Sequence, residues 1–155
     1  MSAENREQNL DQVVQWAVRS GFEVVSVLDS NHDFVVEIAE KETMLHVQIV
    51  HQRTDSPFVL VVGLVNIPET DRNALKEYNG EQFGDLIWEI KLVLLQKGVD
   101  FTVLGAENDP DAWEVQRHLF LNETDLSQFY EAYSKVKNSL IGIIWSYKRA
   151  LDSVE

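Results

Sequence analysis

The sequence contains no cysteine, only three prolines, and half as many basic residues as acidic ones. The absence of cysteine excludes disulfides, thiol nucleophiles, iron–sulfur clusters and cysteine-based zinc sites. None of the seven glycines forms a Gly-x-Gly-x-x-Gly fingerprint or a P-loop, so no phosphate cradle is readable. With 13 Lys+Arg against 26 Asp+Glu, the net charge of −13 repels phosphate backbones. We therefore expect neither nucleic acid nor an anionic membrane as a partner.

Long hydrophobic runs are also missing. The longest hydrophobic segment extends from Phe58 to Val65, between Pro57 and Pro68. It is far shorter than the roughly 20 residues of a membrane-spanning helix. The amino terminus begins polar and lacks the apolar core of a signal peptide, so we expect a cytoplasmic protein. A chain of 155 residues with 45% hydrophobic and 25% charged residues is typical of one globular domain, here residues 1–155.

The hydrophobic periodicity predicts an α+β fold. The predicted helices cover 10–20, 81–96 and 124–151, and the predicted strands cover 22–28, 34–40, 43–52, 58–67, 99–104 and 113–121. Residues 71–78 could add a short helix, and 105–111 form an acidic loop between the last two strands. The resulting order, α-β-β-β-β-α-β-β-α, favours a mostly antiparallel sheet over a doubly wound nucleotide-binding fold.

Two predicted helices carry more apolar residues than one buried face requires. In the helix over 81–96, Trp88, Leu92 and Leu95 lie off the core stripe, and in the last helix Ile141 and Trp145 lie beside it. Tryptophan outside a core stripe is a candidate interface anchor. Two interpretations stay open: these residues form an interface with a partner, or the two helices pack on each other and bury both tryptophans.

Histidine is the first residue to consider for catalysis or metal binding. His46 and His51 lie five apart on one predicted strand and so point to opposite faces, where solvated side chains are the simpler expectation. His118 lies on another strand and could neighbour His46 only if those strands pair. Caps, turns and solubility explain the carboxylates, and no Gly-x-Ser-x-Gly elbow occurs. We expect no catalytic residue, metal or cofactor; the alternative is a small metal-dependent or hydrolytic enzyme using these histidines with carboxylates.

The element order, together with the segment LFLNETDLSQFYEAY over 119–133, resembles the fold of the secretion-chaperone-like proteins, which include acidic bacterial chaperones of type III secretion effectors. The sequence is most similar to a small prokaryotic family of unknown function with that fold, which we expect to be archaeal. The resemblance implies a homodimer that pairs near its middle helix and binds an extended client over apolar sheet surface.

The sequence therefore predicts a non-enzymatic cytosolic binding protein, chaperone-like or regulatory. We expect it to be a homodimer that holds a protein or peptide partner. The expected interface residues are Trp88, Leu92, Leu95, Ile141 and Trp145.

Overall fold

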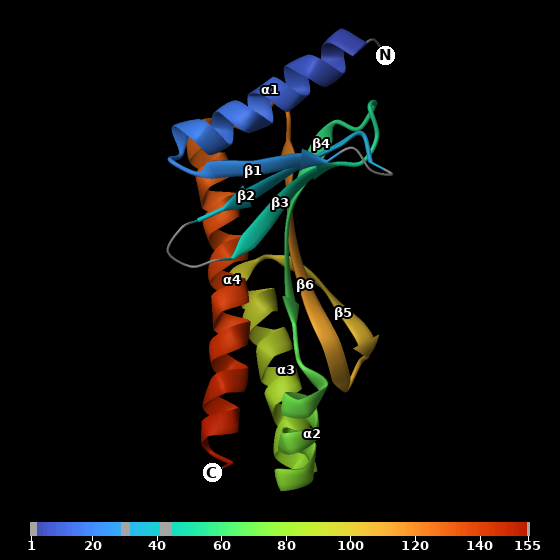
Figure 1. Ribbon diagram of the computed structural model, residues 1–155, viewed down its shortest axis with the longest axis vertical. Helices are drawn as coiled ribbons and strands as arrows, with labels where there is room; N and C mark the ends of the chain where they lie inside the picture. Colours follow the sequence, from blue (N-terminus) through green and yellow to red (C-terminus); the bar gives the residue numbers. More distant parts are fainter. Residues whose placement is uncertain (1–2, 29–31, 41–44, 155) are drawn as a thin grey trace. The chain divides into compact units, whose positions relative to one another are not determined.

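The computed structural model describes residues 3–28, 32–40 and 45–154. Figure 1 shows their arrangement. The elements are α1 (Ala3–Arg19), β1 (Glu23–Leu28), β2 (Phe34–Ala39), β3 (His46–His51), β4 (Phe58–Asn66), α2 (Glu69–Tyr78), α3 (Gly80–Lys97), β5 (Asp100–Ala106), β6 (Asp109–Phe120) and α4 (Leu126–Asp152). Within these residues the strands form a six-stranded antiparallel sheet in the order β1-β2-β3-β4-β6-β5, which confirms the α+β class.

The predicted element order needs one correction, because two helices rather than one lie between β4 and β5. Asn79 causes the break: its side chain accepts hydrogen bonds from the backbone N–H groups of Glu81 and Gln82, each at 3.1 Å. Asparagine is a favoured residue at this capping position. Asn79 therefore ends α2 and begins α3.

The predicted acidic loop over 105–111 is wrong as well. β5 continues to Ala106 and β6 begins at Asp109, so only Glu107 and Asn108 remain as the turn of a hairpin. Gly105 makes this tight reversal possible with φ of +88°, and a Cβ there would lie 2.7 Å from Cγ of Asp111. Only glycine meets both conditions without strain.

The chain groups into two compact units, and each is described separately. Unit 1 comprises Met1–Gly63 with Gln116–Lys137, and unit 2 comprises Leu64–Val115 with Asn138–Glu155. β4, β6 and α4 each continue from one unit into the other. The single domain over 1–155 stays a prediction.

In unit 1, α1 packs on β1 and β2 (Figure 1). Trp16 of α1 stacks on Phe129 of α4, with ring centroids 5.4 Å apart. Phe22 lies 4.1 Å from the ring of Tyr133. Alternate residues of the central strands complete this core, as the period of two requires; they are Phe34, Val36, Ile38, Val47, Ile49, Val59 and Val61. The first part of α4 is thereby joined to α1 by aromatic packing.

In unit 2, Trp113 of β6 is the centre of the core and is fully buried. Its Nε1–H donates a hydrogen bond of 3.0 Å to the hydroxyl of Tyr147 on α4. α3 buries a stripe with the predicted helical spacing: Phe83, Ile87, Ile90 and Leu94. Gly98 ends α3 in the left-handed conformation, with φ of 74°, as glycine commonly does at the end of a helix.

The pKa of Tyr147 is raised to about 12. Burial is the largest cause and the charge of Asp109 adds to it, while the Trp113 hydrogen bond and the charge of Arg72 act in the opposite direction. In the folded protein the Tyr147 hydroxyl keeps its proton above pH 10.0, the ordinary pKa of the group in the unfolded chain. The stability that this group contributes is therefore complete below about pH 10 and is lost as the pH rises through about 12. We expect the free energy of unfolding to fall by roughly 2–3 kcal/mol across that window because of this group.

Urea denaturation at intervals from pH 9 to 12 measures this loss. Tyr147→Phe should remove part of the slope, whereas Tyr78→Phe, whose side chain is exposed, should leave it unchanged. Identical slopes for the wild type and Tyr147→Phe would contradict the assignment.

Candidate interaction surfaces

α3 presents a stripe of large apolar side chains to solvent, and we name Trp88, Leu92 and Leu95 the α3 stripe. Their side chains are 65%, 55% and 64% exposed. Spacings of four and three residues place them on one face of the helix, away from its buried stripe. The sequence prediction that these residues lie off the core stripe is confirmed. The described chain thus leaves three large apolar side chains uncovered in a row.

Two polar contacts locate the α3 stripe beside the β5–β6 hairpin. Nζ of Lys91 lies 5.1 Å from the centroid of the Trp88 ring, within reach of a cation–π interaction. The same Nζ is 2.8 Å from Oε2 of Glu107, which is in the turn between β5 and β6. The tryptophan ring therefore lies near the end of β5.

α4 carries a second apolar surface, and we name Ile141 and Trp145 the α4 pair. Trp145 is 68% exposed and Ile141 is half-buried. Their spacing of four residues puts them on one face of α4, while Tyr147 points into the core. The two exposed tryptophans thus come from different helices of unit 2.

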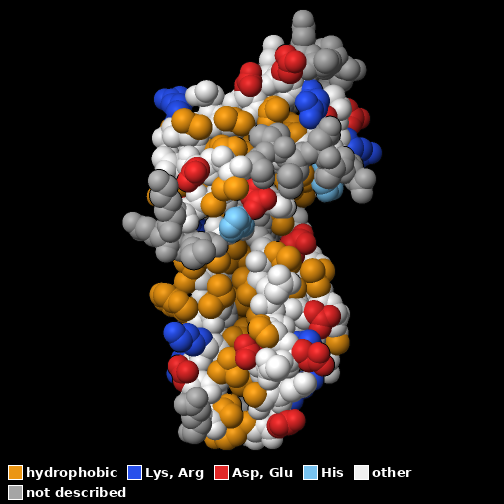
Figure 2. Space-filling view, viewed as in Figure 1, with side chains coloured by type: hydrophobic (Ala, Val, Ile, Leu, Met, Phe, Trp, Pro, Cys, Tyr) orange, Lys and Arg blue, Asp and Glu red, His pale blue; other side chains and the backbone are white. Residues whose placement is uncertain are grey.

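A groove runs between α3 and α4, but the exposed tryptophans are not in it. One part has a volume of about 110 Å³ and a wider part about 490 Å³. The lining includes Glu89 and Val93 from α3 and Gly142, Ser146 and Arg149 from α4. Figure 2 shows acidic and basic side chains among the apolar ones over these two helices. The interpretation in which the helices bury both tryptophans against each other is therefore wrong.

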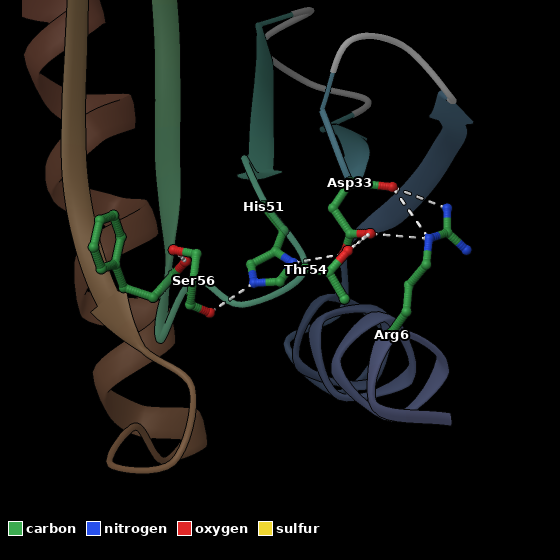
Figure 3. A network of polar contacts seen from close by, with 6 residues as sticks. Arg6, Asp33, His51, Thr54 and Ser56 are labelled. Atoms are coloured by element: carbon green, nitrogen blue, oxygen red, sulfur yellow. Dashed lines mark hydrogen bonds and ion pairs between the residues drawn. The ribbon is translucent and has the colours of Figure 1, made fainter. Parts of the chain in front are cut away.

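Unit 1 contains a buried polar network centred on Asp33 and His51 (Figure 3). Nδ1 of His51 lies 2.7 Å from Oδ2 of Asp33, and Oγ1 of Thr54 donates to Oδ1 of Asp33 at 3.0 Å. Nε of Arg6 is 3.3 Å from the same Oδ1 and also donates to the backbone oxygen of Asp33. The carboxylate therefore joins α1, the start of β2 and the end of β3.

The side chain of His51 was expected to be solvated, but it is completely buried. Its Nε2 donates to the backbone oxygen of Ser56 at 2.9 Å, and its Nδ1 is held by Asp33. A general base needs one ring nitrogen within reach of a substrate proton. Both nitrogens of His51 already have partners inside the fold, so the arrangement supports structure rather than catalysis.

The other two candidate histidines lie apart from this network. His46 pairs with Glu37 on the neighbouring strand, and the ring of His118 lies 4.8 Å from that of Phe58. β4 separates β3 from β6 in the sheet, so the strands of His46 and His118 do not pair. Across the described ranges, no three histidine or acidic side chains gather closely enough to hold a metal ion.

No sequence motif marks Arg6 or Asp33 as members of this network. Their contact depends on strand register, which the structure shows: Phe34 pairs with His51 across β2 and β3, and this brings Asp33 next to the histidine. Asp109 and Asp111, predicted as loop acids, are instead paired with Arg72, and Asp109 also with Lys76. Burial raises the pKa of Asp109, but these two cations outweigh it and the pKa is lowered overall.

None of the helices in the described part of the chain is long and apolar enough to cross a membrane. No curated protein matches the sequence. The crystal structure of an uncharacterized protein from the archaeon Methanothermobacter thermautotrophicus is similar, with a TM-score of 0.81 over 92% of this chain and 99% of that chain, at 16% identity. A family model described as an uncharacterized conserved protein, DUF2299, matches residues 10–147. The chain therefore belongs to the DUF2299 family.

Proposed function

We propose that the protein is a non-enzymatic binding protein of the cytoplasm that forms a homodimer through the α3 stripe. The α4 pair then offers a second surface to a protein or peptide partner, in a chaperone-like or regulatory role. The α3 stripe carries the proposal. Its three large apolar side chains are each more than half exposed, and their exposure to water is unfavourable in free energy. Burial against a partner would remove this unfavourable exposure.

The pattern of the α3 stripe supports a second copy as its partner. When two such helices pack antiparallel about a twofold axis near Leu92, Trp88 of one copy faces Leu95 of the other. Leu92 then faces its own counterpart. Closed dimers use this kind of self-complementary surface. Tryptophan, here Trp88, is also among the residue types most enriched in energetic hot spots.

The polar clusters give the enzyme interpretation no comparable support. Both nitrogens of His51 are engaged by Asp33 and the Ser56 carbonyl. His46 and His118 lie on strands that do not pair. The chaperone-like part of the proposal rests on the resemblance of the element order and of residues 119–133. A fold does not by itself define a function.

The test replaces Trp88 and Leu92 together by glutamate. Light scattering on a sizing column should show a wild-type dimer of twice 17.8 kDa and a folded variant of 17.8 kDa. We expect the dimer to dissociate at least ~100-fold more readily in the variant, since each hot-spot truncation costs about 2 kcal/mol or more. Salt should tighten the wild-type dimer, because it screens the repulsion between two chains of net charge −13.

Trp145→Glu is the matched control, since it places the same charge on an equally exposed tryptophan outside the α3 stripe. This variant should stay dimeric, and circular dichroism should show that all three proteins are folded. A wild type that stays monomeric at every concentration, or a folded double variant that dimerises like the wild type, would overturn the proposal.

A further inference from the structure

The two outer strands of the sheet are built differently. β1 is interrupted by an irregularity between Val24 and Ser26, and such bulges protect a strand edge from pairing with other chains. β5, at the other end of the sheet, is seven residues long and has the sequence DFTVLGA, without lysine, arginine or proline. Its one charged side chain is Asp100 at its start, so the rest of the strand has none of the side chains that usually guard an edge.

The edge of β5 lies on the same flank of unit 2 as the α3 stripe. The carboxyl end of α3 leads through Gly98 into the first residue of β5. Lys91, earlier in α3, forms an ion pair with Glu107, which directly follows the last residue of β5. At about 100° per residue, Trp88 and Leu95 lie within about 60° of Lys91 around the helix axis. Leu92 lies about 100° from Lys91, so Trp88 and Leu95 are the residues of the α3 stripe on the side of the β5–β6 turn.

We propose that β5 pairs antiparallel with β5 of a second copy, so that one sheet continues through the dimer while the two α3 stripes pack on each other. This inference rests on the proposed self-association and adds the strand pairing to it. A twofold axis that passes between two copies of an edge strand pairs them antiparallel. The same axis makes the neighbouring helices antiparallel, as the packing of Trp88 against Leu95 requires.

Charge also favours a second copy at this edge. When the pairing is centred on Thr102, Asp100 faces Leu104 of the other copy. When it is centred on Val103, Asp100 faces Ala106. In both registers the two Asp100 carboxylates lie at opposite ends of the strand pair. Like charges directly opposite each other, which destabilise strand pairs, are thereby avoided. The exposed side chains of Thr102 and Leu104 become neighbours across the new pair.

The absence of cysteine makes a direct test possible. Opposed residues of an antiparallel pair have Cβ atoms about 4.5–5.5 Å apart, close to the separation that a disulfide bridges. Under mild oxidation, Thr102→Cys should form covalent dimers if the pairing is centred on Thr102, and the double variant Thr102→Cys with Leu104→Cys should do so if it is centred on Val103. We expect at least ~10-fold more covalent dimer than for Trp145→Cys.

The outcomes separate this inference from the proposed function. A wild-type dimer whose Thr102 and Leu104 variants do not cross-link, although they remain dimers, overturns the strand pairing and leaves the α3 interface standing. Cross-linking that persists when Trp88 and Leu92 are replaced by glutamate overturns the α3 interface and supports the pairing. A protein that is monomeric throughout overturns both.

Discussion

Asp33→Ala should destabilise the protein by about 3–5 kcal/mol, the range found when one member of a buried ion pair is removed. Asp33 is 5% exposed and accepts from His51, Thr54 and Arg6. Without the carboxylate, Nδ1 of the fully buried His51 has no partner and no access to water. Urea denaturation followed by circular dichroism should show the midpoint falling while the slope with denaturant stays constant.

Asp55→Ala is the matched control, since Asp55 is an exposed carboxylate close in sequence to Thr54 and Ser56. Its effect should stay within about 0.5 kcal/mol. An Asp33→Ala variant as stable as this control would show that the network contributes little, and the structural explanation for His51 would then fail.

Trp113→Ala should cost about 3–5 kcal/mol, as for other buried tryptophans replaced by alanine. The change opens a cavity in the core of unit 2 beside Phe101, whose ring centroid lies 6.3 Å away. It also removes the donor to the buried hydroxyl of Tyr147. A buried polar group without a partner adds a penalty of its own. Thermal and urea denaturation measure the combined loss.

Trp145→Ala provides the comparison, because the same side chain is removed from a position that is 68% exposed. Its free energy of unfolding should stay close to that of the wild type. Trp113→Phe should recover most of the packing and leave the hydroxyl of Tyr147 without its donor, so its cost should be intermediate. Equal stability of the Trp113→Ala and Trp145→Ala variants would contradict the described core.

Sequence periodicity predicted the helices and strands well because each signal is local. The buried stripe of α3 and its end at Gly98 both follow from spacing and from the left-handed preference of glycine. The exposure of Trp88, Leu92 and Leu95 follows in the same way, since residues off the core stripe point to solvent when no second element covers them. This part of the candidate surface could be predicted from the sequence.

The missed features depend on contacts between distant residues. The pairing of β2 with β3 brings Asp33, 18 residues away, to the ring of His51. The period of two puts His51 on the same face as the buried Val47 and Ile49, so its burial follows from the pattern and the expectation of a solvated side chain was wrong. Its partner Asp33 depends on strand register, which was not readable from the sequence. The possible short helix over 71–78 and the break before 81 were readable from the sequence, but the predicted element order left this helix out. The capping hydrogen bonds of Asn79 that separate α2 from α3 became visible only in the structure.

The four tryptophans of this chain divide into two buried and two exposed rings. Trp16 and Trp113 lie in the interiors of units 1 and 2, whereas Trp88 and Trp145 face solvent from α3 and α4. Intrinsic fluorescence can therefore distinguish interior from surface without any added dye. Acrylamide should quench Trp145 strongly at every protein concentration. When Trp88 is the sole tryptophan retained, its quenching should weaken and its emission should shift to the blue as the protein concentration rises and the dimer forms.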